Sequence, residues 1–255
     1  MTANAKPTIY WDNLLCKAQS ITCDNSASDH PAQYLADWRE YLKWRSSTAG
    51  YAEIKIDLGE AQEVDTIIIY GHNLGEVNAG RYLHTNYSDN GWAWREFEDI
   101  HSFPSSNDPV IFHKDSPVSA RYWLVVFSGT DIAEISLIFL GKGMEFPCYA
   151  EAGFDPNRQE LVLERVRSER GYLLGTTINY RRRRMTINLP YLPDSWVRDN
   201  FLRFWQEHIP KPFLFSWDRE NHPEETYLVE LAEPRLELPY NPIYRSLQLE
   251  LEGRG

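Results

Sequence analysis

The chain has 255 residues, a formal net charge of −11, and 42% hydrophobic and 14% aromatic residues. This length fits one large β domain or two ordinary ones, and the apolar content is enough for a folded core. The acidic balance argues against a general nucleic-acid coat, because duplex binding needs basic patches that neutralise phosphates. The three cysteines form no CxxC pair, and neither a signal peptide nor a membrane span is evident, so we expect synthesis in a cytoplasm and no membrane insertion.

The first half of the chain predicts short strands separated by turns. Apolar residues alternate with charged ones in the first of these segments, which is the pattern of a strand with one wet face. The predicted strands cover residues 53–58, 64–70, 92–97, 121–127 and 132–140. Many short strands at this spacing predict an all-β sandwich. Residues 31–44 are the exception, since they fit either a short helix or a loop with one helical turn.

The character of the chain changes after Gly143. Residues 159–193 alternate between apolar and charged types around Glu169-Arg170-Gly171, which predicts two or three strands. A helix is predicted over about 195–208, with Asp194 or Ser195 as its N-cap. We therefore predict an all-β protein, in which a jelly-roll sandwich at 8–143 precedes a second β-sandwich with one helix at 146–255.

A series of short segments in the first half resembles the discoidin, or coagulation-factor C-type, family of galactose-binding-like jelly rolls. The matching segments are Ala32, Leu35 and Asp37, Trp44-Arg45-Ser46, Ile54 to Gly59, Val64 to Ile67, Tyr87 to Gly91 with Trp94, Ala120-Arg121-Tyr122, and Ile132 to Ile135. The resemblance implies that Trp44, Asp57-Leu58-Gly59 and Trp94 are framework. It also implies that a ligand, often a glycan or a lipid head group, meets the loops at one end of the sandwich. The bridging disulfide of many secreted members is not evident, which puts an extracellular animal-type role in doubt.

The second half resembles the sandwich-plus-helix modules of bacteriophage tail-tube, distal-tail and hub proteins. The similarity lies in overall character: a helix ending in Phe204-Trp205, then residues 211–218 and Tyr227-Leu228-Val229. It implies assembly into a ring, although likeness of fold is not by itself a function.

No motif of an enzyme is present among those considered. The sequence contains no GxSxG, P-loop, HExxH or glycine-rich dinucleotide turn, and its seven histidines show no metal-ligand spacing. We therefore predict a protein that is not an enzyme, with no cofactor and no metal.

Candidate glycan contacts are aromatic and polar residues outside the framework. Sugar rings stack on exposed aromatics, and nearby polar groups fix their orientation. The candidates are Tyr34, Trp38, Arg39, His72, Asn73, Arg81 and Trp92. For Gly71-His72-Asn73 the alternative is a structural turn at the end of a strand, which we favour. For the aromatics the alternative is a contact with the second domain or a neighbouring subunit.

The run Arg181-Arg182-Arg183-Arg184 would place two guanidinium groups on each face of a strand. Buried arginines need partners, so the run predicts an interface with carboxylates of a neighbouring subunit, such as Glu160, Glu164 or Glu169. A lumen that DNA passes through is the second interpretation, and a solvated hairpin is the third.

These observations together predict a structural component of a bacteriophage or phage-derived tail tip or baseplate. It would form a homo-oligomeric ring through its second domain and contact other tail proteins (tube, hub or fibre), or host surface glycans, through its first. It would belong to the virion tail and be synthesised in the bacterial host cytoplasm. The alternative is a free-standing, non-catalytic carbohydrate-binding protein.

Overall fold

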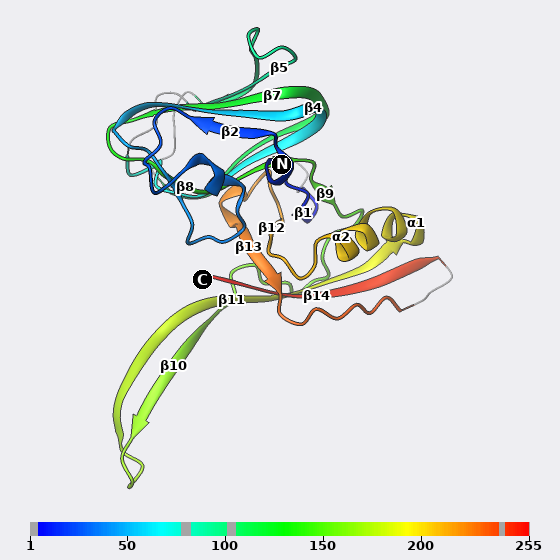
Figure 1. Ribbon diagram of the computed structural model, residues 1–255. Coiled ribbons are helices and arrows are strands. Elements are labelled where there is room, and N and C mark those ends of the chain that lie inside the picture. Colours follow the sequence, from blue (N-terminus) through cyan, green and yellow to red (C-terminus); the bar gives the residue numbers. More distant parts are fainter. Residues whose placement is uncertain (1–4, 78–82, 101–105, 240–242, 255) are drawn as a thin grey trace. The chain divides into compact units, whose positions relative to one another are not determined.

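The computed structural model describes residues 5–77, 83–100, 106–239 and 243–254 (Figure 1). The chain divides into two compact units. We call Asp12–Gly143 the inserted unit, and Met1–Trp11 together with Met144–Gly255 the discontinuous unit. The chain thus begins in one unit, forms the other, and returns to the first.

The inserted unit is an antiparallel sheet that wraps around its own core. Its hydrogen-bonded order is β3 (Trp44–Arg45), β8 (Glu134–Gly141), β4 (Gly50–His72), β7 (Val110–Gly129), β5 (Leu83–Ser88) and β6 (Arg95–Ile100), with β2 (Ser20–Cys23) on β4. Two short 3₁₀ helices, η1 (Leu14–Lys17) and η2 (Ala32–Ala36), complete it.

Strand β4 determines how the two layers of the sandwich are connected. Its first half pairs with β2 and its second half with β8, while β7 pairs with it along both halves. The register shifts between Asp57 and Gln62, where Gly59 takes a positive φ of 83° that suits glycine. A single bulged strand therefore passes from one layer to the other, where two strands were predicted.

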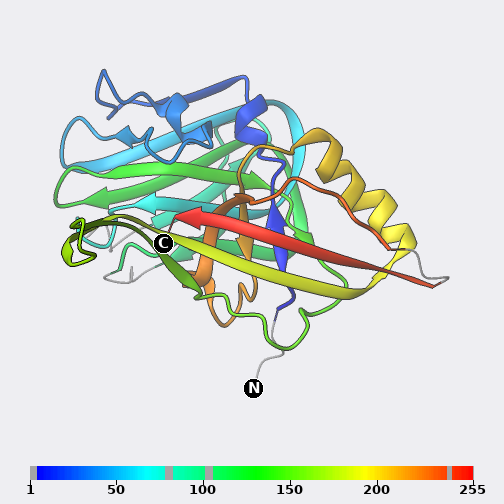
Figure 2. The same ribbon diagram turned by 90° about the horizontal axis from the view of Figure 1, so that it is seen from below.

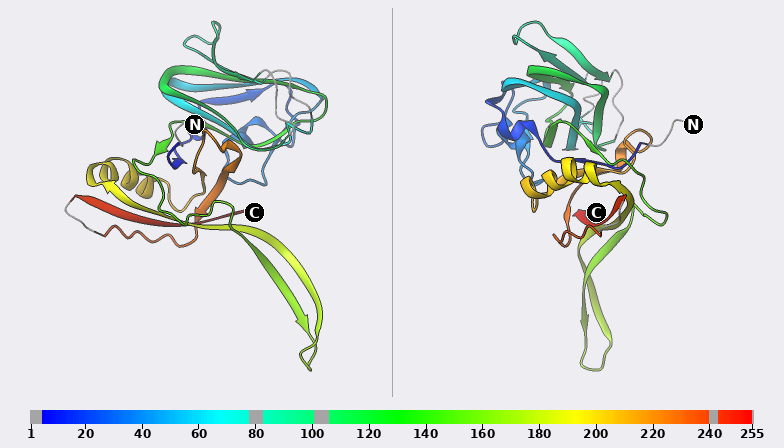
Figure 3. Two further views of the ribbon diagram at one scale, coloured as in Figure 1. Left: turned by 180° about the vertical axis from the view of Figure 1, so that it is seen from behind. Right: turned by 90° about the vertical axis from the view of Figure 1, so that its right-hand side faces the viewer.

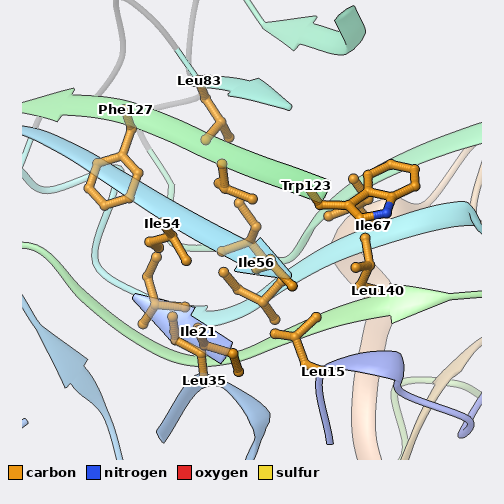
Figure 4. Close-up of a cluster of buried hydrophobic side chains, with 14 of the residues drawn as sticks. Leu15, Ile21, Leu35, Ile54, Ile56, Ile67, Leu83, Trp123, Phe127 and Leu140 are labelled. Atoms are coloured by element: carbon orange, nitrogen blue, oxygen red, sulfur yellow. The ribbon is translucent and has the colours of Figure 1, made fainter. Parts of the chain in front are cut away.

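The core of the inserted unit lies between these layers (Figure 4). Ile54 and Ile56 come from the first half of β4, and Ile67 comes from its second half. They converge with Trp123 and Phe127 of β7, which are almost completely buried. The predicted alternation at 53–58 is confirmed, because Ile54 and Ile56 point inward while Lys55 is exposed.

The discontinuous unit is built on a second seven-stranded antiparallel sheet. Its order is β10 (Gln159–Arg167), β11 (Leu173–Pro193), β14 (Tyr244–Arg254), β13 (Thr226–Leu231), β12 (Phe213–Ser216), β1 (Thr8–Tyr10) and β9 (Met144–Glu145). Figures 1 and 2 show β14 lying along β11. A 3₁₀ turn, η4 (Pro223–Glu225), precedes β13.

The predicted helix is present as a continuous helical segment of three parts. These are α1 (Asp194–Trp196), a π-helical turn η3 (Val197–Phe201) and α2 (Leu202–Glu207). Its apolar face, with Val197, Phe201 and Phe204, is buried in the core of the unit. The predicted N-cap is wrong: Pro193 holds that position without a side-chain cap, and Asp194 instead accepts hydrogen bonds from Arg198 and Arg245.

The predicted all-β class with one helical segment is confirmed. The predicted first domain started at residue 8, but β1 (Thr8–Tyr10) pairs with β12 and β9 of the discontinuous unit. For residues 31–44, the structure has the one-turn alternative, η2, followed by a loop.

Candidate functional site

A groove of about 300 Å³ on the inserted unit brings three aromatic side chains together with polar ones. Its lining is Ser20, Thr22, Lys55, Ile56, Asp57, Asn90, Gly91, Trp92, Trp94 and Tyr122. These residues come from β2, the first half of β4, β7 and the loop that joins β5 to β6. The groove includes one predicted contact, Trp92.

Trp92 is held by a turn whose backbone is fixed by its own side chains. The Asn90 Oδ1 accepts hydrogen bonds from the N–H groups of Trp92 and Ala93, both at 2.9 Å. The Ser88 Oγ accepts from the N–H of Gly91 at 3.1 Å, and Gly91 has a φ of 75°. The turn therefore presents the Trp92 indole to solvent, where it is 88% exposed.

Asp57 and Tyr122, which line the groove, both contact Arg121. Arg121 makes a two-pronged ion pair with Asp57, with Nε–Oδ1 at 2.7 Å and Nη2–Oδ2 at 2.8 Å. This hydrogen bonding holds the pKa of Asp57 below its usual value, so the carboxylate stays ionised at neutral pH. The same guanidinium lies 4.8 Å from the centroid of the Tyr122 ring. Tyr122 and Asp57 are thus oriented by one arginine.

Lys55 adds an ammonium group to the groove. Its hydrogen bond with Glu53 raises the pKa of Lys55, so the side chain is charged at neutral pH. The groove therefore offers an exposed aromatic face beside groups that donate and accept hydrogen bonds. This chemistry suits a small polar ligand that has one apolar face.

The other predicted aromatic contacts lie in and after η2. Tyr34 and Trp38 are half-buried, and Arg39 is exposed. Arg39 forms a two-pronged ion pair with Asp37, with its Nη2 at 2.6 Å from Oδ2 and its Nε at 2.9 Å from Oδ1. None of the three lines the Trp92 groove, so the predicted aromatic contacts fall in two separate places, the groove and the segment around η2. The predicted contact Arg81 lies outside the described residues.

Gly71-His72-Asn73 is a turn at the end of β4, as the favoured structural interpretation predicts. His72 is 5% exposed, and its Nδ1 accepts a hydrogen bond from the N–H of Leu74. Burial lowers the pKa of His72 to about 4, so the ring is neutral at neutral pH. The Asn73 amide donates to Ile132 O and accepts from the N–H of Glu134. Both side chains serve the connection between β4 and β8, and we leave them out of the candidate site.

The arginine run finds carboxylates within its own chain. Arg182 bridges Glu160 of β10 and Glu252 of β14, at 3.0 Å each, and Arg184 pairs with Glu250 at 3.1 Å. Adjacent strands place glutamates opposite both arginines, so their charges are balanced without a second chain, and the interface with a neighbouring subunit stays a prediction.

The odd-numbered members of the run behave differently. Arg183 is 7% exposed, donates to Pro156 O at 2.7 Å and lies 3.6 Å from the Tyr227 ring centroid. Arg181 is exposed. Arg183 thus differs from Arg182 and Arg184, whose partners are glutamates, and Arg181 is the most exposed of the four.

One group of possible metal ligands occurs among the described residues. Ligand atoms of His222, Glu224 and Glu225 lie within 4.8 Å of one another. Glu225 accepts hydrogen bonds from Trp217 Nε1 and Asn157 Nδ2, and His222 stacks on Trp217. Structural contacts therefore account for these side chains.

Lys55, Asp57 and Tyr122 belong to the groove but were not predicted as contacts. Lys55 and Asp57 alternate with buried isoleucines, so their outward direction was readable from the period of the strand. Asp57 and Trp94 were assigned to the framework, and Tyr122 was considered only as part of a segment that carries the family resemblance, so none of them was proposed as a contact.

Comparison with known proteins finds one family model that matches part of the chain. The model of the F5/8 type C domain matches residues 18–139. No curated protein sequence matched the chain. No helix in the described part of the chain is long and apolar enough to cross a membrane.

Several solved structures are similar to about half of the chain. The family 32 carbohydrate-binding module of NanJ from Clostridium perfringens, in complex with galactose, is 18% identical with a TM-score of 0.43, covering 52% of this chain and 98% of that one. A further module from that organism, CpGH89CBM32-5 in complex with GalNAc-β-1,3-galactose, is 15% identical with a TM-score of 0.43, covering 51% and 100%. A Ruminococcus gnavus GH29 fucosidase in complex with fucose is 19% identical with a TM-score of 0.42, covering 51% of this chain and 26% of its own.

The chain thus spans about a quarter of the fucosidases it matches and nearly all of the separate modules. Nothing in these comparisons supports the predicted phage-tail domain in the second half. Residues 18–139, which lie within the inserted unit, match the model of the F5/8 type C domain.

Proposed function

We propose that the inserted unit binds a carbohydrate without transforming it, and that the Trp92 groove is the binding site. The observation that carries the proposal is the Trp92 indole, held 88% exposed beside Asp57, Lys55 and Tyr122 in one groove. What supports a binding site is not the exposure alone but the position of this indole in one groove with Trp94, Tyr122 and charged side chains.

The chemistry of the groove matches that of a sugar ring. The axial C–H groups of a pyranose form an apolar face that packs on an indole, and its hydroxyls need donors and acceptors around the rim. The ionised Asp57 accepts from hydroxyls, and the Lys55 ammonium donates to them. Because both charges have fixed partners, the groove is preorganised and loses little side-chain freedom when a ligand binds.

The non-catalytic carbohydrate-binding alternative is therefore preferred to the tail-tip component. The groove and the family match at residues 18–139 both support it. The tail-tip role has no comparable support.

The test is a glycan array with the full chain, followed by titration calorimetry with the best ligand. We expect Trp92→Ala to weaken binding by roughly tenfold or more, because the stacking face is lost. The fold should survive, since the side chain is exposed. Trp38→Ala tests the other candidate position, the segment after η2. Tyr191→Ala is the matched control, because Tyr191 is an aromatic residue of the discontinuous unit that is 65% exposed.

The variants separate the candidate sites. Loss of binding in Trp92→Ala alone supports the groove. Loss in Trp38→Ala alone would move the site to the loop after η2. Unchanged binding in both, or no retention of any glycan by the unaltered chain, would contradict the proposal.

A further inference from the structure

The β10–β11 ribbon extends well beyond the rest of its sheet (Figure 3). Strand β14 pairs with β11 only from Arg182 onward, so the preceding part of β11 pairs with β10 alone. We call residues 161–181 the arm. Two-stranded ribbons are marginally stable in water, because neither face is covered.

The arm carries apolar side chains that nothing in its own chain covers. The residues concerned are Leu161, Val166, Tyr172, Leu173, Leu174, Ile178 and Tyr180, which are 49% to 70% exposed. A soluble protein rarely leaves so many large apolar groups on one projecting element unless that element meets a partner. The arm therefore has the properties of an interaction surface.

The charge of the arm differs in sign from that of the remaining chain. The arm contains four arginines and two glutamates, a net charge of +2, which leaves −13 on the other residues. Among the described residues, Arg165, Arg170 and Arg181 have no recorded ion pair. A partner that offers both carboxylates and apolar surface would complement the arm.

The discontinuous unit itself presents such a surface, which we call the acidic groove. It has a volume of about 410 Å³ and is lined by Glu151, Glu233, Glu237 and Glu250, and its accessible apolar side chains are Pro190 and Pro239. Arg235 is the single cation in the lining, and it pairs with Glu237. In the part of the chain that the structure describes, no ion pair is recorded for the exposed Glu151 and Glu233.

A second groove at the base of the arm is less suitable. It is lined by Arg181, Arg182 and Arg254 against Glu230 and Glu252, so cations outnumber carboxylates there. The positively charged arm is attracted by the carboxylates of the acidic groove and repelled by the arginines of this second groove.

The arm cannot reach the acidic groove of its own chain. Leu173 and Leu189 belong to the same continuous strand, β11, so the tip of the arm is held roughly 50 Å along the strand from its own groove. We propose that the arm of one chain inserts into the acidic groove of a second copy. This contact joins two different surfaces, so repeating it produces a closed ring or an open filament.

The experiment uses sedimentation velocity of the full chain over a series from about 1 to about 100 µM. The arm variant is Arg165→Glu with Arg170→Glu, and the groove variant is Glu151→Arg with Glu233→Arg. The control for the arm variant is Lys17→Glu with Lys211→Glu, which makes the same change in net charge elsewhere. Circular dichroism establishes that each variant is folded.

We expect the unaltered chain to self-associate as its concentration rises. Each charge reversal should weaken the association roughly tenfold or more, while the control variant should not. Mixing the arm variant with the groove variant should restore association, because each reversed arm then meets a reversed groove. Rings or filaments should appear by negative-stain microscopy.

Three results would overturn the proposal. The first is an unaltered chain that stays monomeric throughout the series. The second is charge reversals that act no more strongly than the control. The third is a mixture of the two folded variants that does not associate. None of these results affects the Trp92 groove, because the arm and the acidic groove belong to the discontinuous unit.

Discussion

His72 links the fold of the inserted unit to pH. Its ring is neutral in the folded chain because burial lowers its pKa to about 4, against 6.5 for an exposed histidine. Below pH 6.5 the unfolded chain takes up a proton that the folded chain refuses. The free energy of unfolding therefore falls as pH falls from about 6.5 to about 4, by about 1.4 kcal/mol per unit and about 3 kcal/mol in all.

The substitution His72→Asn should remove this part of the pH dependence. The Asn Oδ1 can replace Nδ1 as the acceptor for the N–H of Leu74, so the turn keeps its hydrogen bond. We expect urea unfolding at pH 7, 5.5 and 4.5 to show a smaller loss of stability in the variant than in the unaltered chain. Carboxylates that titrate in this range affect both proteins equally. Parallel losses would mean that another group causes the effect.

A substitution at Gly71 tests the backbone conformation of the same turn. Its φ is 63°, and a Cβ there would lie 2.6 Å from Ser136 Oγ, which donates a hydrogen bond to Gly71 O. Gly71→Ala should therefore combine backbone strain with a steric conflict and lower the free energy of unfolding by about 2 kcal/mol or more. Gly91→Ala is the control, because Gly91 has a similar φ, 75°, but its nearest neighbours, atoms of the Tyr122 ring, lie at an ordinary contact distance of 3.7 Å. Equal effects in denaturant unfolding would show that only the backbone angle matters.

At the scale of elements, the sequence predicted those features that depend only on residues close together in the chain. The alternation at 53–58 gave the direction of each side chain in that part of β4, and apolar spacing gave the helical segment with its buried Phe201 and Phe204. The extent of β4 was not predictable, because the bulge after Asp57 continues the strand where the acidic sequence resembles a turn.

Elements whose form depends on distant partners were beyond sequence reasoning. The two carboxylate partners of Arg182 are far from it in the sequence. Glu160 lies 22 residues before it, and Glu252 lies 70 residues after it. No local pattern reports them. The same holds for the candidate site, where Trp92 was predicted from its turn but Tyr122 required the pairing of β4 with β7. The exposure of the arm was likewise not predictable, because it depends on the point along β11 at which the pairing with β14 ends.

At the scale of the whole molecule, the chain contains two separate cores. One cluster of buried residues belongs to the inserted unit, and the other belongs to the discontinuous unit. Ile9 is part of the second cluster, although it precedes the inserted unit in the chain. It is completely buried in β1, between β12 and β9. The predicted boundary at residue 8 missed this strand, because three residues cannot show a period.

The two cores predict two transitions in thermal unfolding, which reciprocal substitutions should separate. Ile9→Ala removes buried volume from the discontinuous unit, and Ile54→Ala removes the same side chain, equally buried, from the inserted unit. Each should cost about 2–5 kcal/mol in its own unit, because the cavity is only partly refilled. Calorimetry should show one transition shifted by each variant, and hydrogen exchange followed by mass spectrometry should assign it to its residues. If either substitution shifts both transitions together, the two units unfold cooperatively, and the prediction of two independent transitions is wrong.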